Sequence, residues 1–441
     1  MPKTPKFDAA LDAILADLKP HTRVCTETGE SFNISPKDIE MFKLLRVPPP
    51  KTTWWARTRQ KRLFIAGFEF FRRTLPDGRT TVSMFDPESF THMLPNVEWH
   101  GEAFDPFSYG KPLDPQKPFF AQWQELSRAV PRPAIVQDTK SVNSDYAIYS
   151  LEAKNCYYTL GGLNNEDLLY ADMCGWTKNS ADDILLMKSE WCYFDAVCTE
   201  CTRTSFSERC EGCIDVLFSQ FCKNCMDCFG CTNLRNRKFC FFNEQLTEEE
   251  YKKRIAAIDL SDARVVEEWK AKAVQLWKTA YRRSETNRRS ENVVGDEIND
   301  SRDVEGIVVQ KSERCYHGYG LPGGGKDCMD FLSSAKTERC YNTGRTFNAY
   351  ENRMTFATDG CIDVEYSELL TSCEHCFGCF GLKHKKFCIF NVQYTEAEYW
   401  PLVDAIKTAM LERGEYGEFF PHALSPHAYN ASHAMTLFPE T

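Results

Sequence analysis

Small and apolar residues recur at a fixed spacing between positions 141 and 394, and many of them are cysteines. All twelve cysteines from 156 to 240 fall on two positions, three residues apart, of a six-residue repeat. Five of them follow one another at intervals of 18 residues: Cys156, Cys174, Cys192, Cys210 and Cys228. The inward positions of a narrow stack of coils must be small or apolar, and the cysteine thiol meets that need.

A period of 18 residues made of three hexads is typical of a β-solenoid, in which equivalent residues of stacked coils form columns. Three hexads per coil favour a left-handed triangular β-helix, although the hexads lack its usual aliphatic-plus-small pattern, so a right-handed coil stays open. The predicted fold is therefore mainly β: a tandem β-solenoid with coils of about 18 residues, an α+β N-terminal head, and helices that close each repeat.

The chain also contains a tandem duplication with an offset of 148 residues. Gly212–Val216 returns as Gly360–Val364, and residues 225–251 return as 373–399. Both copies end in Thr-Glu-x-Glu-Tyr, in which a Thr N-cap and a Glu three residues later predict the start of a helix. We expect helices over 248–287, with a break near 260–262, and over 396–412.

Five segments follow from these patterns and from the scarcity of cysteine near the N-terminus. The predicted segments are an α+β head (1–140), a first cysteine-rich solenoid block (141–246), a helical connector (247–289), a second cysteine-rich block (290–394), and a C-terminal helix with an aromatic tail (395–441).

Composition limits the class of protein. The chain has 441 residues with 42% hydrophobic and 26% charged positions, which is typical of a folded soluble protein. It has no uncharged apolar run of 18 residues and no signal-peptide pattern, so we expect a cytoplasmic protein without a membrane partner. In that compartment its 21 cysteines are expected to be packed thiols or metal ligands rather than disulfides.

Two cysteine runs are candidate metal ligands: Cys222, Cys225, Cys228 and Cys231, and in the second copy Cys373, Cys376 and Cys379. Their spacing resembles that of iron–sulfur or zinc ligands. The repeat alone also produces this spacing, and Leu370 replaces the first cysteine in the second copy. We therefore favour a buried ladder of thiols without a cofactor, with Zn²⁺ as the first alternative and an iron–sulfur cluster as the second.

Basic residues interleaved with aromatic ones are candidate nucleic-acid ligands, because such residues bind phosphate and stack on bases. They are Trp54, Trp55, Arg57, Arg59, Lys61, Arg62, Arg72 and Arg73 in the head, with Arg282 and Arg283 in the connector. The competing interpretation is a solvated strand pair in the head and a solvated helix end in the connector. A net charge of −10 argues against general coating of nucleic acid.

Evidence for an enzyme is weak in this sequence. Some left-handed β-helices are acyltransferases with a catalytic histidine, and His317, His375 and His384 are the candidates here. None of them lies in a motif that specifies a base, and the chain has no Walker loop, H-E-x-x-H or G-x-S-x-G. The sequence therefore favours a protein without catalytic activity.

With these motifs, the chain resembles an uncharacterised cysteine-rich repeat family common in candidate-phyla bacteria. The resemblance rests on residues 25–32, 47–50, 114–120 and 414–421 and on the repeated Cys-Phe-Gly-Cys. It implies a zinc-ribbon-like head, but only Cys25 remains of the expected ligands, since Thr53 and Thr74 occupy two of the cysteine positions. One thiolate cannot hold a structural zinc, so the resemblance implies a degenerate ribbon. It implies no activity.

The sequence thus favours a non-catalytic scaffold or adaptor that presents a flat surface to a macromolecular partner. One alternative is a protein that binds nucleic acid or a ribonucleoprotein through the basic and aromatic head. The other alternative is a zinc or iron–sulfur protein that uses the two cysteine runs.

Overall fold

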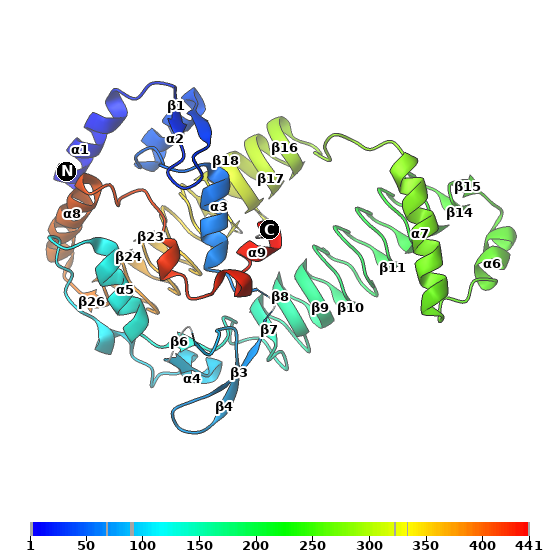
Figure 1. Ribbon diagram of the computed structural model, residues 1–441, viewed down its shortest axis with the longest axis horizontal. Helices are drawn as coiled ribbons and strands as arrows, with labels where there is room; N and C mark the ends of the chain where they lie inside the picture. The colour runs from blue at the N-terminus through cyan, green and yellow to red at the C-terminus, as the bar shows by residue number, and fades with distance from the viewer. Residues whose placement is uncertain (1–2, 68, 89–91, 322, 333, 440–441) are drawn as a thin grey trace.

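A computed structural model describes residues 3–67, 69–88, 92–321, 323–332 and 334–439, and its strands form two long parallel ladders (Figure 1). The first ladder (residues 137–245) contains β7 (Ala147–Leu151), β8 (Tyr157–Leu163), β9 (Glu166–Gly175), β10 (Lys178–Ala181), β11 (Thr202–Ser205), β12 (Ile214–Leu217), β13 (Met226–Phe229), β14 (Lys238–Phe241) and the antiparallel β15 (Glu244–Gln245). The second ladder (residues 288–393) contains β16 (Glu291–Asn299), β17 (Arg302–Gln310), β18 (Ser312–Leu321), β19 (Gly325–Met329), β20 (Ser334–Ala335), β21 (Thr337–Glu338), β22 (Thr346–Phe347), β23 (Ile362–Glu365), β24 (Glu374–Phe377), β25 (Lys386–Ile389) and the antiparallel β26 (Val392–Gln393).

Each coil of the first ladder is 12 residues long. Thr202 pairs with Ile214, and Val216 pairs with Cys228, which in turn pairs with Cys240. One residue in three points inward and is buried, so each coil has four sides of three residues. The residue before most inward positions has φ near +50°, for example +54° at Phe206, and this left-handed residue turns the chain at every corner.

The prediction of a mainly β chain built from 18-residue solenoid coils is wrong. The structure has mixed content, 25% helix and 33% strand, with several parallel sheets. The coil length was misjudged because cysteines that occupy every third position align equally well at 12 and at 18 residues. Cys156 and Cys174, 18 residues apart, therefore lie one and a half coils apart, on opposite sides of the ladder.

The duplication and its helices are confirmed. Strands β12, β13 and β14 have counterparts at an offset of 148 residues in β23, β24 and β25. The connector holds α6 (Glu248–Ala256) and α7 (Ala263–Thr279), separated near the expected break, and the second copy ends in α8 (Glu396–Glu412). Capping boxes at Thr247 and Thr395 start α6 and α8, as the repeated motif predicts.

The head is a set of short elements that wraps the second ladder. It comprises α1 (Pro5–Ala16), β1 (His21–Val24), β2 (Ser31–Ile34), α2 (Pro36–Leu45), α3 (Trp54–Leu63), β3 (Phe71–Thr74), β4 (Thr80–Ser83), β5 (Met93–Leu94), α4 (Asn96–His100), α5 (Phe119–Ala129) and β6 (Arg132–Pro133). Residues 54–63 thus form a helix and not the strand pair that the competing interpretation expects.

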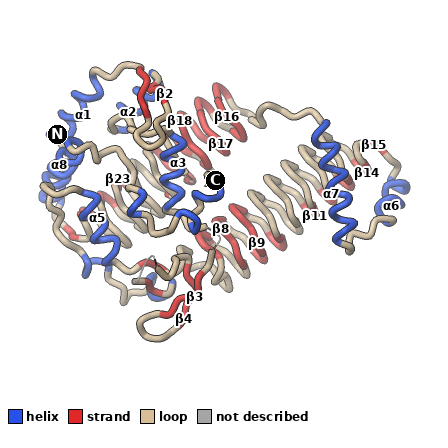
Figure 2. The backbone as a smooth tube through the Cα atoms, in the orientation of Figure 1, coloured by secondary structure: helices blue, strands red, loops and turns tan. Residues whose placement is uncertain are grey.

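The head, the second ladder and the C-terminal tail share one hydrophobic core. Its buried members include Phe42 and Trp123 of the head, Tyr341 of the second ladder and Phe420 of the tail. The tail ends in α9 (Ala434–Leu437) and bridges back to the head between Ser432 and Ala66. The first ladder leaves this lobe as an arm with α6 and α7 at its far end, as the ribbon and the tube both show (Figures 1 and 2).

Within the ranges that the structure describes, no helix has both the length and the apolar character needed to cross a bilayer.

Candidate functional site

The cysteine run 222–231 encircles one coil of the first ladder. Its four residues lie on four successive sides, and all are buried. Each thiol donates to the carbonyl two residues earlier: Cys222 to Gln220 (3.6 Å), Cys225 to Lys223 (3.4 Å), Cys228 to Met226 (3.3 Å) and Cys231 to Phe229 (3.4 Å). The run therefore fills the interior of a coil.

The second run repeats this arrangement at Cys373, Cys376 and Cys379, whose thiols donate to the carbonyls of Thr371, Glu374 and Phe377. Away from the densest cysteines, burial raises the pKa of the Cys192 thiol to about 12, so that thiol is protonated at neutral pH. Among the described residues, no group of three or more His, Cys, Asp or Glu side chains is arranged to hold a metal ion.

Most of the charge on α3 points into the protein. Arg57 forms an ion pair with Asp330 of the second ladder (3.1 Å), and Arg62 contacts the imidazole of His433 (2.7 Å). Lys61 is fully buried, and burial lowers its pKa to about 7. These three cations hold the head against the second ladder and the tail, and they are not available to phosphates outside the protein.

The other candidate nucleic-acid residues are scattered. Trp54 stacks on Trp55 at 3.9 Å, and Arg59 pairs with Glu27 at the surface. Arg73 donates to the carbonyl of Asp86 (2.7 Å), while Arg72 is exposed on β3. Arg282 and Arg283 lie beyond the end of α7, in the segment that leads back to the second ladder. The structure does not gather these residues into one basic surface.

Cys25 retains the local geometry of a metal-binding knuckle without the other ligands. Its sulfur accepts N–H groups from Thr28 (3.4 Å) and from Thr53 (3.5 Å), one of the residues that replace an expected cysteine. Burial opposes ionisation of this thiol, but the hydrogen bonds outweigh it and lower its pKa.

The candidate catalytic histidines lie apart, and two of them are held by carboxylates. The imidazole of His317 contacts Asp38 of α2 (2.6 Å) and Glu305 (3.3 Å). The imidazole of His375 contacts Asp363 (2.8 Å) and Glu374 (3.2 Å), while His384 is exposed. The two ion-paired imidazoles thus join neighbouring elements.

One side of the first ladder, which we call the aromatic face, carries a continuous series of large side chains. It consists of the outward positions 157–158, 169–170, 181–182, 193–194, 205–206, 217–218, 229–230 and 241–242. Rings of successive coils pack on one another: Tyr193 on Phe206 (5.4 Å between centroids), Phe206 on Phe218 (4.8 Å) and Phe218 on Phe229 (5.1 Å). Only Ala181 and Asp182 interrupt the series.

Both ends of the aromatic face are covered by the chain itself. At the far end Trp269 of α7 packs edge-on against Phe229 (5.4 Å) and Phe241 (5.6 Å). At the end near the head, Phe70 packs on Tyr146 (5.4 Å) and Tyr158 (4.8 Å). These contacts bury the rings that they cover, such as Phe218 and Phe229.

The middle of the aromatic face is open to solvent. Its exposed side chains, which we call the uncovered patch, are Tyr157 (41% exposed), Leu169 (45%), Tyr170 (52%), Tyr193 (44%) and Phe194 (48%). The sequence analysis did not find this patch. The signal was present in the 12-residue spacing of Phe194, Phe206 and Phe218, which the stronger cysteine pattern obscured.

Neither a scan against protein-family models nor a search of curated proteins finds a match to this chain.

Proposed function

We propose that this protein is a non-catalytic adaptor that binds a protein partner through the uncovered patch of the first ladder. One observation carries the proposal: five large apolar or aromatic side chains, each at least 41% exposed, lie together on one side of the arm. Contiguous exposed apolar surface of this kind typically marks an interaction site.

The kind of partner follows from the way the chain covers the rest of the same face. There α7 lays Trp269 on Phe229 and Phe241, and Lys270 lies over the ring of Phe194 (4.6 Å). An amphipathic helix therefore already fits this face, directly beside the uncovered patch. We infer that the partner supplies a second such helix, with an aromatic or aliphatic stripe laid along the ladder.

The charges near the patch favour a protein over a nucleic acid. Lys154 and Lys178 both pair with Glu166, Lys188 pairs with Glu200, and Arg203 pairs with Asp215. Binding of single-stranded nucleic acid needs a cationic groove beside the stacking rings. Here the nearby cations are neutralised, so the rings are left to apolar contacts.

Buried free thiols support action in a reducing compartment, and we propose the cytoplasm. All 21 cysteines are buried and free. The ladder thiols that would be lost to oxidation form its interior, so a reducing environment preserves the packing.

Photo-crosslinking in cells tests the proposal. p-Benzoylphenylalanine replaces Tyr170 or Tyr193 in the patch and, as a matched control, Glu200, which lies two sides further round the coil. We expect both patch positions to crosslink to the same segment of one protein, an amphipathic helix, and the control to give no such product. Crosslinks to nucleic acid or to a second copy of this chain would contradict the proposal, as would equal yields at all three positions.

A further inference from the structure

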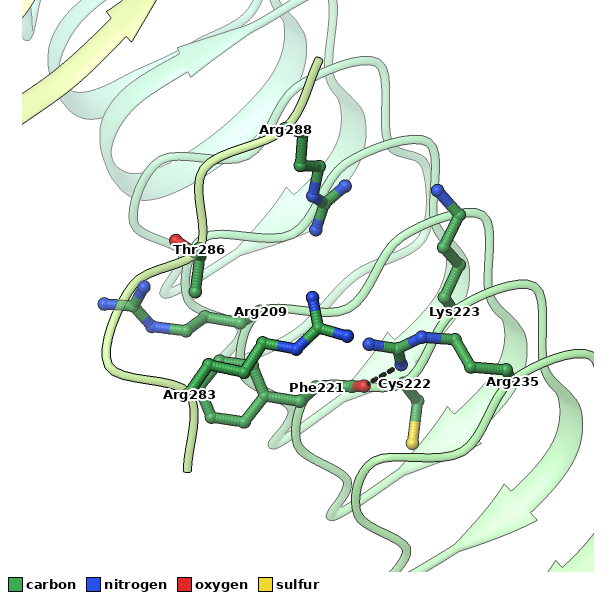
Figure 3. Close-up of a pocket in the computed structure, with 8 residues that line it drawn as sticks. All are labelled: Arg209, Phe221, Cys222, Lys223, Arg235, Arg283, Thr286 and Arg288. Atoms are coloured by element: carbon green, nitrogen blue, oxygen red, sulfur yellow. Dashed lines mark hydrogen bonds between the residues drawn. The ribbon is translucent and has the colours of Figure 1, made fainter. Parts of the chain in front are cut away.

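A second feature lies on a different side of the first ladder. The segment that follows α7 runs back along this ladder and encloses a hollow of about 280 Å³ (Figure 3). Five basic side chains line it: Arg209, Lys223, Arg235, Arg283 and Arg288. Three come from successive coils of the ladder and two from the segment, so the hollow forms only when the two are packed together.

Carboxylates neutralise three of these cations. Arg209 pairs with Glu297, while Lys223 (2.8 Å) and Arg288 share Glu211. These contacts fix the segment on the ladder and leave the positions of the basic groups well defined.

The other two arginines have no carboxylate within ion-pair distance among the described residues. The guanidinium of Arg235 donates only to the backbone carbonyls of Phe221 and Leu234 (2.9 Å for Leu234). Arg283 enters from the opposite side, and Figure 3 shows its guanidinium directed toward that of Arg235. Two like charges brought together without an anion between them repel each other, and an anion placed there removes that cost.

We propose that this hollow binds one phosphate group, either as inorganic phosphate or as the phosphate of a small phosphomonoester. Two guanidinium groups that approach from opposite sides can each donate a forked pair of hydrogen bonds to a tetrahedral dianion. Glu211 and Glu297 border the hollow and would repel the neighbouring phosphates of a nucleic acid backbone. The site is therefore matched to an isolated phosphate, and it is separate from the uncovered patch.

Calorimetry with the full chain and inorganic phosphate tests the site. Arg235→Gln and Arg283→Gln each remove one unpaired guanidinium, and Arg282→Gln removes an exposed neighbour that does not line the hollow. We expect each of the first two to weaken phosphate binding about tenfold, and Arg282→Gln to leave it unchanged. Unfolding curves of all variants verify that the fold is intact.

Two further titrations identify the source of the phosphate. If the proposal is correct, either inorganic phosphate or a nucleoside monophosphate binds most tightly, and a ten-nucleotide RNA binds no more tightly than that ligand. Three results would overturn it: no phosphate binding to the wild type, equal losses in all three variants, or tighter RNA binding that also depends on Arg282.

Discussion

Single charged residues join parts of this chain that are far apart in sequence. Arg132 of β6 pairs with Glu368 (3.1 Å), and Lys407 of α8 pairs with Glu365 (2.7 Å), in both cases with the two side chains buried. Removing one member of a buried pair leaves an uncompensated charge and costs about 3–5 kcal/mol. The lobe is thus held together by specific buried pairs as well as by its shared core.

Lys61 is the buried cation without such a partner. Its amine makes no hydrogen bond to the described residues, and the charges around it are Asp330, Arg57 and Arg62. Burial lowers its pKa from 10.5 to about 7, so the folded state pays to keep it charged below pH 7, and this cost fades between pH 7 and pH 10.5. We expect Lys61→Met to raise the free energy of unfolding by about 2–4 kcal/mol at pH 6.

Denaturant unfolding of the wild type and of Lys61→Met across this pH range measures the difference. The stability gain of the variant should shrink as the pH rises toward 10.5. A destabilised variant, or a gain that does not change with pH, would contradict the assignment of Lys61 as a buried and unsatisfied amine.

His317 behaves in the opposite way. Burial would lower its pKa, but Asp38 and Glu305 outweigh burial and raise it to about 9. The raised pKa stabilises the fold fully below the unfolded value of about 6.5, and this stabilisation is lost as the pH rises from about 6.5 to 9. We expect His317→Gln to lose about 2–3 kcal/mol at pH 6 and to approach the wild type near pH 9. Equal losses at both pH values would point to packing rather than charge.

Residue roles in the head could not be predicted from sequence. A run such as Arg57–Arg62 has the composition of a solvated surface, and its burial depends on Asp330 and His433, more than 270 residues away. Local composition carries no information on such long-range partners. The position of Thr53 beside Cys25, by contrast, agrees with the alignment of motifs on which the family resemblance rests.

At the scale of elements, sequence motifs were most informative where a local interaction specifies the structure. The Thr-Glu-x-Glu motif places the starts of α6 and α8 correctly, because a capping box is formed by residues three positions apart. The repeat predicts stacked parallel strands with cysteines inside. It could not give the coil length, because 12 and 18 are both multiples of the three-residue spacing between inward positions.

The interior thiols should act as packing groups. Cys225→Ala removes one buried thiol and leaves a small cavity, so we expect a loss of about 1–2 kcal/mol in unfolding free energy. Elemental analysis of protein purified without oxygen should find less than one zinc or iron per chain, in both the wild type and the variant. Stoichiometric metal that Cys225→Ala abolishes would show that the run 222–231 is a metal site.

Helix α7 should depend on its contact with the aromatic face. Trp269→Ala removes the ring that packs on Phe229, Phe241 and Phe242. Because Trp269 is half-buried, we expect a local loss of about 2 kcal/mol, faster hydrogen exchange over 263–279, and more binding of a hydrophobic dye to the newly exposed rings. Unchanged exchange in α7 would mean that other contacts hold it. Trp191→Ala, an exposed ring on a neighbouring side, serves as the control.

The whole molecule combines a compact lobe with a projecting arm (Figure 1). The duplication predicted two similar blocks, but one ladder is enclosed by the head and tail while the other is largely free. This difference arises from segments outside the repeats, whose aromatic residues pack into the shared core. The free ladder carries the exposed rings, so the duplicated block without a cover is the one available to a partner.

The most direct test of this account measures the affinity of the crosslinked partner, purified, for variants of the uncovered patch. Leu169→Glu and Tyr193→Ala remove central apolar contacts, and the matched control Trp191→Ala removes an exposed ring outside the patch. We predict losses of about 100-fold for each patch variant, equivalent to about 2.7 kcal/mol, and no change for the control. Patch variants that fold normally and bind with wild-type affinity would contradict the assignment of this face as the docking surface.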